Sequence, residues 1–205
     1  MRSNSVVYWE VDAQRDFMLP GGALYVPGAE NRIPNLKRLV DAARRGEVFL
    51  VSSACHHAPG DPEFATFGPH CIRDTPGAQI ISEALADKVV RIPSAMQFSW
   101  PSDLSAYQQV VLEKQSIDVF TNPQTNVLVD RLPRNVHYVV FGVVTEYCVG
   151  MAVKGLLQRG RRVSVVKDAI ETLNPTEGDR TLAHVEAMGA NLISTDEALA
   201  LVSPV

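Results

Sequence analysis

Short apolar runs alternate with longer segments of helical spacing along nearly the whole of this chain. The runs are rich in β-branched and aromatic residues, which favour strands, and cover residues 6–11, 48–53, 88–92, 110–113, 136–141, 162–166 and 191–193. Helical spacing of apolar residues covers residues 31–45, 79–85, 125–132, 151–159, 176–188 and 195–201. Strands that alternate with helices in this way predict a mainly parallel α/β sandwich.

The composition is that of a globular protein with one core. The chain has 205 residues, of which 46% are hydrophobic and 20% are charged, and this length favours a single domain over residues 1–205. A formal net charge of -4 gives no general attraction to nucleic acid or to anionic membranes, so we expect a small neutral or cationic substrate. The apolar run that follows residues 1–5 is too short and too charged for a signal peptide or a membrane span, which predicts a cytoplasmic protein.

Reactive side chains stand where several of the predicted strands end. Asp12 ends the first strand, Lys114 follows the run 110–113, and Cys148 lies where strand 136–141 passes into a helical segment. The carboxyl ends of parallel strands share one edge of a sheet, so we expect these side chains to meet. Free N–H groups at a helix start favour a thiolate and can hold an oxyanion. Taken alone, Cys148 equally suits a core cysteine that only fills space.

Such a set of side chains is able to cleave an amide. A Cys148 thiolate attacks the acyl carbon, the Asp12 carboxylate takes the thiol proton and later gives it to the leaving amine, and the Lys114 ammonium holds the anions in place. A lysine beside a cysteine also lowers the thiol pKa. Glu10 breaks the apolar pattern of the first strand, so we expect it to have a partner or to lie at an open strand end.

A long loop between the second strand and Cys71 is dense in Pro, Gly and potential metal ligands. A loop of this length inside a compact domain is usually functional. The chain's cysteines are Cys55, Cys71 and Cys148, which are odd in number and lack a CxxC spacing, so we expect no disulfide framework.

Several sequence motifs resemble those of the isochorismatase-like cysteine hydrolases, which include nicotinamidase/pyrazinamidase and N-carbamoylsarcosine amidase. The motifs are VDAQRDF at 11–17, LPGGAL at 19–24, PHC at 69–71 and GVVTEYCV at 142–149. The resemblance implies a three-layer α/β/α sandwich with a mainly parallel six-stranded sheet, and a homo-oligomer, either a dimer or a tetramer. It also implies that Asp12, Lys114 and Cys148 form the catalytic set.

The same resemblance implies the surroundings of the catalytic set. A non-proline cis peptide between Val143 and Val144 would direct the Val144 and Cys148 N–H groups to the oxyanion. Aromatic walls of the substrate pocket are expected at Phe17, Phe67 and Phe120.

The resemblance further implies a divalent metal, Zn, Fe or Mn, and no organic cofactor. His57, Glu63 and His70 match ligand positions of nicotinamidases, whereas Cys55 stands where those enzymes have an Asp. A thiolate can bind Zn²⁺, so the site can persist with softer ligands. A register built on His56 instead would leave no metal site, and both alternatives stay open at this point.

These observations predict a Cys148-dependent amidohydrolase that cleaves a C–N bond of a small molecule through a thioester, with nicotinamide as the first substrate to test. One alternative is a metal-free member of the same superfamily that acts on N-carbamoyl or ureido substrates. Another is a catalytically silent ligand-binding or scaffold member, in which Glu10 and Cys55 would mark loss of the catalytic function.

Overall fold

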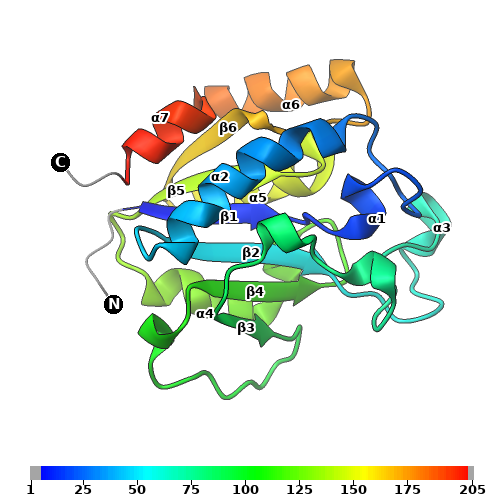
Figure 1. Ribbon diagram of the computed structural model, residues 1–205, viewed down its shortest axis with the longest axis horizontal. Helices are drawn as coiled ribbons and strands as arrows, with labels where there is room; N and C mark the ends of the chain where they lie inside the picture. The colour runs from blue at the N-terminus through cyan, green and yellow to red at the C-terminus, as the bar shows by residue number, and fades with distance from the viewer. Residues whose placement is uncertain (1–5, 203–205) are drawn as a thin grey trace.

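A computed structural model of the protein describes residues 6–202 and has one parallel sheet at its centre (Figure 1). The sheet has seven strands in the order β3-β4-β2-β1-β5-β6-β7. Their bounds are β1 Val6–Val11, β2 Phe49–Cys55, β3 Val89–Ile92, β4 Gln109–Lys114, β5 His137–Gly142, β6 Arg162–Ile170 and β7 Asn191–Ile193. The α/β class is confirmed. Every run predicted to be a strand forms one, so the six strands implied by the resemblance are one too few.

Helices cover both faces of this sheet. The α-helices of the described residues are α1 Arg15–Met18, α2 Ile33–Arg44, α3 Phe64–Phe67, α4 Pro123–Arg131, α5 Gly150–Gln158, α6 Pro175–Ala187 and α7 Thr195–Ala200, of which α1 and α3 are single turns in loops at the strand ends. The helix predicted over residues 79–85 is wrong: short 3₁₀ turns occur at Pro76–Ala78 and Ser82–Ala84 instead. Pro76 and Gly77 favour a turn here. The segment 79–85 is also too short to be stable as a helix without extensive packing.

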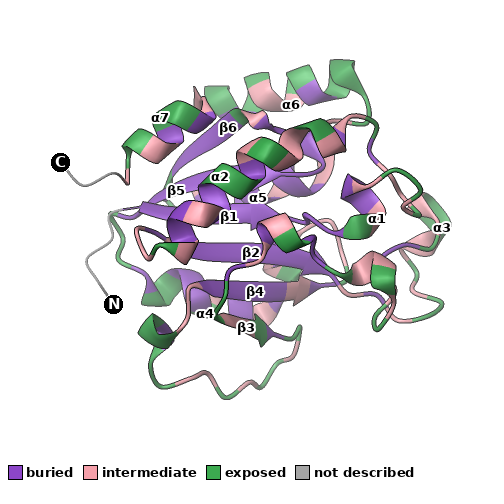
Figure 2. Cartoon of the chain, in the orientation of Figure 1, coloured by how far each residue is buried: buried purple, intermediate pink, exposed green. Residues whose placement is uncertain are grey.

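The core has two halves, one on each face of the sheet. Leu36 and Leu39 of α2 pack in the half that contains Tyr8 of β1, and Val153 and Leu156 of α5 pack in the half that contains Trp9. Strand β1 is buried over all of its residues, as expected for a central parallel strand covered on both faces. Figure 2 shows the consequence, with buried strands inside and exposed residues on the outer sides of the helices.

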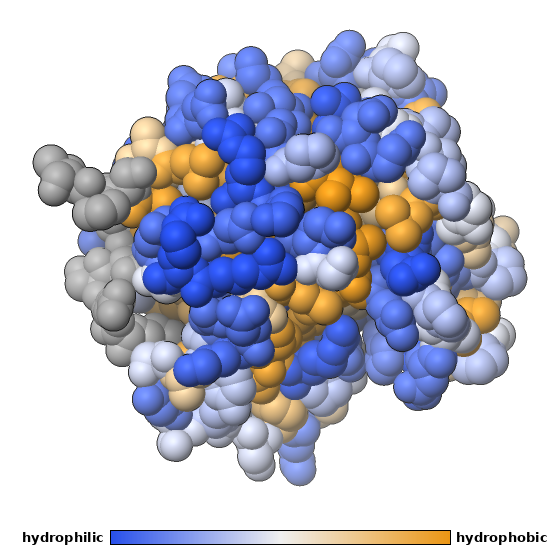
Figure 3. Space-filling model, in the orientation of Figure 1, coloured by the Kyte–Doolittle hydropathy of each residue, from blue (hydrophilic) through white to orange (hydrophobic). Residues whose placement is uncertain are grey.

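The surface over α2 is mainly hydrophilic, with apolar side chains visible between the charged ones (Figure 3). Among residues 6–202, no helix is long and apolar enough to cross a bilayer. The apolar run on which the expectation of no signal peptide rested forms β1, and residues 1–5 before it lie outside the described range.

Gly142, the last residue of β5, provides a test of how closely the two central strands approach. Its φ is +115°, and a Cβ at this position would collide with the Val11 backbone carbonyl of β1. We expect Gly142→Ala to lower the free energy of unfolding by about 3 kcal/mol or more, measured by urea denaturation.

Gly189 is the matched control for this substitution. Its φ of +107° is similar, but a Cβ there meets no atom within 4 Å. Gly189→Ala therefore introduces the backbone strain without the collision. We expect this strain alone to lower the free energy of unfolding by about 1–2 kcal/mol. Equal losses in the two variants would contradict the close packing of β5 on β1.

Candidate active site

The ends of β1, β2 and β4 bring polar side chains to one edge of the sheet. Cys55 pairs with Lys114 in the β2–β4 register, and the Asp12 N–H donates to the Ser53 carbonyl at 3.1 Å. Strand β2 extends to Cys55 instead of ending at Ser53 as predicted. Cys55 is therefore a strand residue at the site and not the start of the loop.

Lys114 is the centre of this cluster. Its Nζ lies 2.8 Å from Asp12 Oδ2, 3.0 Å from Cys55 Sγ and 3.5 Å from Cys148 Sγ. The Ser53 hydroxyl donates to the other oxygen of Asp12 at 2.7 Å. Both Lys114 and Asp12 are almost completely buried. The structure thus brings together the three predicted side chains, with the Cys55 thiol as a fourth member.

Cys148 lies in a turn that joins β5 to α5. Residues Thr145–Val149 form one π-helical turn, and α5 begins directly after it. The turn is fixed to the residue that follows β6, because the N–H and hydroxyl of Thr145 both donate to the Glu171 carbonyl, at 2.8 and 2.7 Å. The expected cis peptide between Val143 and Val144 is present. Within residues 6–202, the Val144 N–H makes no hydrogen bond to the chain.

The cluster favours a charged lysine and a neutral thiol. Burial lowers the pKa of Lys114, but the Asp12 carboxylate and the two sulfurs outweigh it, so the pKa is raised well above its usual range. A hydrogen bond with Cys55, together with burial, raises the pKa of Cys148 although Lys114 opposes this. The lowering by Lys114 that the sequence predicts is present, but the Cys55 hydrogen bond and burial outweigh it, so the net pKa of the Cys148 thiol is raised and the resting thiol is neutral.

A small cavity of about 20 Å³ lies beside Cys148, which is room for about one water molecule. Its lining comprises Phe17, Leu24, Cys55, Glu63, Phe67, His70, Ile117, Val144, Tyr147, Cys148 and Leu173. Phe17 and Phe67 are thus at the cavity, as expected. An open groove of about 400 Å³ on the outer side shares Glu63, Phe67 and Ile117 with it, so these side chains separate the two spaces.

The structure places Phe120 away from this cavity. Its ring stacks on Trp9 with 6.3 Å between ring centroids, and the Arg159 guanidinium lies 3.7 Å from its ring centroid. Phe120 therefore packs in the core on the α5 side of the sheet. Tyr147 takes an aromatic position at the cavity instead, in an edge-to-face contact with Phe67 at 5.2 Å.

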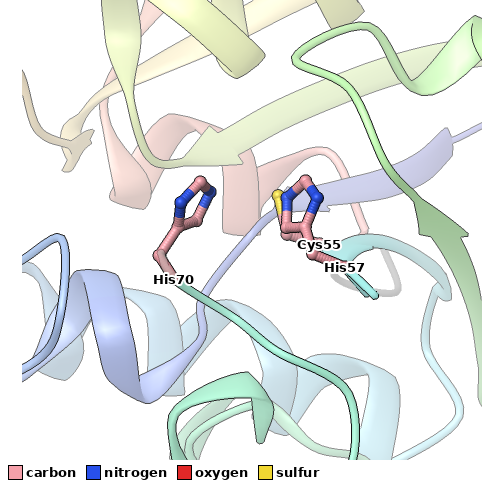
Figure 4. A group of neighbouring side chains, drawn as sticks. All are labelled: Cys55, His57 and His70. Atoms are coloured by element: carbon pink, nitrogen blue, oxygen red, sulfur yellow. The ribbon is translucent and has the colours of Figure 1, made fainter. Parts of the chain in front are cut away.

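The predicted metal ligands converge beside the Lys114 cluster. Cys55, His57 and His70 offer ligand atoms that all lie within 4.8 Å of one another, and Figure 4 shows His57 beside Cys55 with His70 reaching in from the loop. Glu63 Oε2 lies 3.7 Å from His57 Nε2. His56 points elsewhere, to Glu113 at 3.2 Å, so the geometry favours the register built on His57.

These residues fit a metal ion by their chemistry. Neither His57 Nε2 nor Glu63 Oε2 makes a hydrogen bond within the described chain, although both are buried. Burial lowers the pKa of His57 and favours the neutral imidazole that binds metals. His70 uses Nδ1 for the Gly68 carbonyl at 2.9 Å, which leaves Nε2 for a ligand. Orphaned buried polar atoms of this kind are costly unless a further group satisfies them.

Several residues of the site were not recognised in the sequence. Asp61 lies 3.1 Å from His57 Nδ1, the arrangement in which a carboxylate orients a metal-binding histidine. Gln14 binds the Cys55 backbone on both sides, accepting from its N–H at 2.7 Å and donating to its carbonyl at 2.8 Å. The Gln of the VDAQRDF motif was a usable signal for Gln14, but a single Asp in a loop gives none for Asp61.

Glu146 is a further residue whose role only the structure reveals. Its carboxylate accepts from the Leu173 and Asn174 N–H groups at 3.0 and 2.7 Å, and from the Thr172 hydroxyl at 2.6 Å. These bonds fix the loop that carries Leu173 over the cavity beside Cys148. Another cavity of about 410 Å³ lies at the opposite end of the strands, near Val7 and Phe49.

Comparison with known proteins places this arrangement in context. Nicotinamidase from Escherichia coli is 28% identical over 204 residues, which cover 89% of this chain and 91% of that protein. The fold is similar to the zinc complex of Pyrococcus horikoshii pyrazinamidase, with a TM-score of 0.72, 23% identity and coverage of 93% and 99% of the two chains. It is also similar to Thermoplasma acidophilum N-carbamoylsarcosine amidase, with a TM-score of 0.68, 23% identity and coverage of 93% and 96%.

The family itself follows from the match to a sequence model. The model of the Isochorismatase domain matches residues 10–95 and 100–197, which is most of the chain and includes each side chain of the Lys114 cluster. The protein belongs to the isochorismatase family.

Proposed function

We propose that this protein is a cysteine amidohydrolase that cleaves a C–N amide bond of a small molecule through a thioester at Cys148. The observation that carries the proposal is the meeting of Asp12, Lys114 and Cys148 at one buried point, with Lys114 Nζ 2.8 Å from the carboxylate and 3.5 Å from the sulfur. The likeness to a curated nicotinamidase supports an aromatic carboxamide as substrate. A cytoplasmic location and a homo-oligomer remain predictions from the sequence.

The chemistry begins with a proton transfer, because the resting thiol is neutral. Asp12 accepts the Cys148 proton as the sulfur attacks the carbonyl carbon, and the same proton then passes to the leaving nitrogen, which departs as ammonia or an amine. Water attacks the thioester with Asp12 again as the base, which frees the carboxylic acid and returns the proton to sulfur. The ammonium of Lys114 stabilises the negative charge on Asp12 and on the attacking sulfur.

The oxyanion formed on the carbonyl requires hydrogen-bond donors. We assign this role to the backbone N–H groups of Val144 and Cys148, and the free Val144 N–H supports the assignment. Val144 and Cys148 both line the small cavity, so a carbonyl placed there would lie against both residues. Donors already held in place stabilise the developing charge without reorganisation.

A divalent metal would be held by Cys55, His57, Glu63 and His70. Bound there, it would supply a Lewis acid that binds a heterocyclic nitrogen of the substrate and so fixes the ring beside Cys148. The thiolate of Cys55 favours a soft or borderline ion such as Zn²⁺ over Mg²⁺ or Ca²⁺.

The narrow cavity beside Cys148 must widen before a substrate enters. A space of about 20 Å³ does not hold a carboxamide ring, whereas the outer groove of about 400 Å³ does. We therefore propose that substrate binds from the outer groove and displaces the Phe67 side chain from its contact with Tyr147. Closure of the same side chains would then exclude water during the attack.

Replacement of the nucleophile gives the direct test. Cys148→Ala should lower kcat for nicotinamide or pyrazinamide hydrolysis by at least ~10³-fold, measured as ammonia release, since Cys148 supplies the sulfur of the proposed thioester. Cys71→Ala is the matched control, because Cys71 is also buried and free but is not among the side chains that contact Lys114. A panel that also contains N-carbamoyl and ureido compounds identifies the metal-free alternative, and no turnover of any amide by the wild type would favour the silent binding protein.

Metal binding has a test that does not need activity. Protein dialysed with Zn²⁺ should retain about one ion per chain by elemental analysis, and His57→Gln should abolish this. Co²⁺ in the same site should give a thiolate-to-metal absorption band that disappears in Cys55→Ser.

His56→Gln is the control for the metal experiment, because His56 contacts Glu113 and not the cluster. It should bind the same amount of metal as the wild type. A Co²⁺ spectrum that is unchanged in Cys55→Ser would exclude Cys55 as a ligand while leaving the amidase chemistry in place.

A further inference from the structure

Glu10 is a carboxylic acid buried in the central strand of the sheet, with no exposed surface. Its neighbours across the strand pairs are Ser52 on β2 and Phe141 on β5, so no cation stands opposite it in the sheet. The open strand end considered from the sequence is therefore absent. Because a buried carboxyl without a counter-ion is unfavourable, its presence requires a specific contact that offsets the cost.

The contact is with the turn that carries Asp12. Glu10 Oε1 accepts a hydrogen bond from the Ala13 N–H at 2.8 Å, and Ala13 is itself fully buried. The neighbouring bonds of the turn come from the backbone: the Asp12 N–H donates to Ser53 at 3.1 Å, and the Gln14 N–H donates to the Asp12 carbonyl at 2.7 Å. Glu10 is thus the side chain that completes the hydrogen bonding of this turn.

The turn has an unusual backbone conformation at Asp12. Its φ is +49°, in the left-handed region that L-residues other than Gly, Asn and Asp seldom adopt. In this conformation the carboxylate reaches Ser53 Oγ at 2.7 Å and Lys114 Nζ at 2.8 Å. If the Ala13 N–H lost its acceptor, a buried donor would be left unsatisfied and the turn would relax toward a conformation that satisfies it.

We propose that Glu10 is a positioning residue for the amidase reaction, whose side-chain oxygen holds the Ala13 N–H and thereby keeps the Asp12 carboxylate directed at Lys114. The inference rests on the proposed function of Asp12 as the proton acceptor. It adds a residue that touches neither substrate nor the sulfur, and that acts through the backbone of the turn.

The protonation state of Glu10 agrees with this role. Burial raises the pKa of Glu10 to about 8, with the nearby Ser52 hydroxyl and the hydrogen bond from the Ala13 N–H opposing the shift. Of the charged groups that act on it, the nearby Asp12 raises the pKa and Arg91 on β3 lowers it. On β4, Gln109 donates to the Ser52 hydroxyl at 2.7 Å and so supplies only a neutral dipole. At neutral pH the Glu10 side chain is therefore mainly the uncharged acid. Glutamine has a similar shape and also carries an oxygen that accepts a hydrogen bond.

The test compares Glu10→Gln and Glu10→Met with Tyr8→Phe. Glutamine retains an acceptor for the Ala13 N–H, whereas methionine has a similar length and no comparable acceptor. Tyr8 lies on the same face of β1 as Glu10, and its hydroxyl donates to the Ala198 carbonyl at 2.7 Å. Tyr8→Phe therefore removes one buried hydrogen bond of the same strand without touching the turn.

Two readouts separate positioning from general damage. The first is kcat and KM for amide hydrolysis, and the second is the rate at which iodoacetamide alkylates Cys148 as a function of pH, followed by mass spectrometry of the Cys148 peptide. Glu10→Met should lower kcat by on the order of 10²-fold with little change in KM, and should shift the pH profile of alkylation. Glu10→Gln at pH 7 should remain within a few-fold of the wild type, and Tyr8→Phe should change neither readout.

Equal effects of Glu10→Met and Tyr8→Phe would overturn the proposal, and so would a Glu10→Gln protein as impaired as Glu10→Met. If the methionine variant is too unstable to purify, Glu10→Val replaces it, because a β-branched side chain suits a buried strand. A wild-type protein that hydrolyses no amide would refute the proposed function. The alkylation profiles would still decide whether Glu10 governs the surroundings of Cys148.

Discussion

The ion pair between Lys114 and Asp12 is the interaction on which the site depends. Both side chains are buried, and a buried pair is favourable only when further hydrogen bonds satisfy its remaining donors and acceptors. Ser53 supplies one such bond to Asp12, and the sulfurs of Cys55 and Cys148 accept from Lys114. The charges therefore hold the thiols in place, and removal of either partner would leave an uncompensated charge within the sheet.

Cys55 connects two parts of the site that the sequence presents separately. Its sulfur lies 3.0 Å from Lys114 Nζ and also within 4.8 Å of the ligand atoms of His57 and His70. A thiol at this position thus belongs to both the Lys114 cluster and the metal-ligand cluster. The hydrogen bond that raises the pKa of Cys148 comes from the same residue, so Cys55 affects the nucleophile as well as the ligand set.

The apolar pattern of the sequence predicted the strands correctly where it matches the burial seen in the structure. The central strands were predicted because runs such as Val136 to Phe141 are apolar on both faces, which a parallel sheet between two helical layers requires. Residues 79–85 were predicted wrongly because a short apolar spacing was taken for a helix despite the turn residues before it. Phe120 was expected at the pocket, but its ring packs against Trp9 and Arg159, a choice that depends on the packing of α5 and not on nearby sequence.

Local residue types place Asp12 and Lys114 at the ends of strands and Cys148 in the turn after one, because they predict the order of strands and turns. The tertiary structure brings these ends together, since the strand order sets β4, β2, β1 and β5 side by side. It also decided the protonation of Cys148 and Glu10, because burial and neighbours from distant segments set a pKa. The sequence identifies the reactive groups, whereas the free energy of ionising each group depends on its burial and on its neighbours in the folded protein.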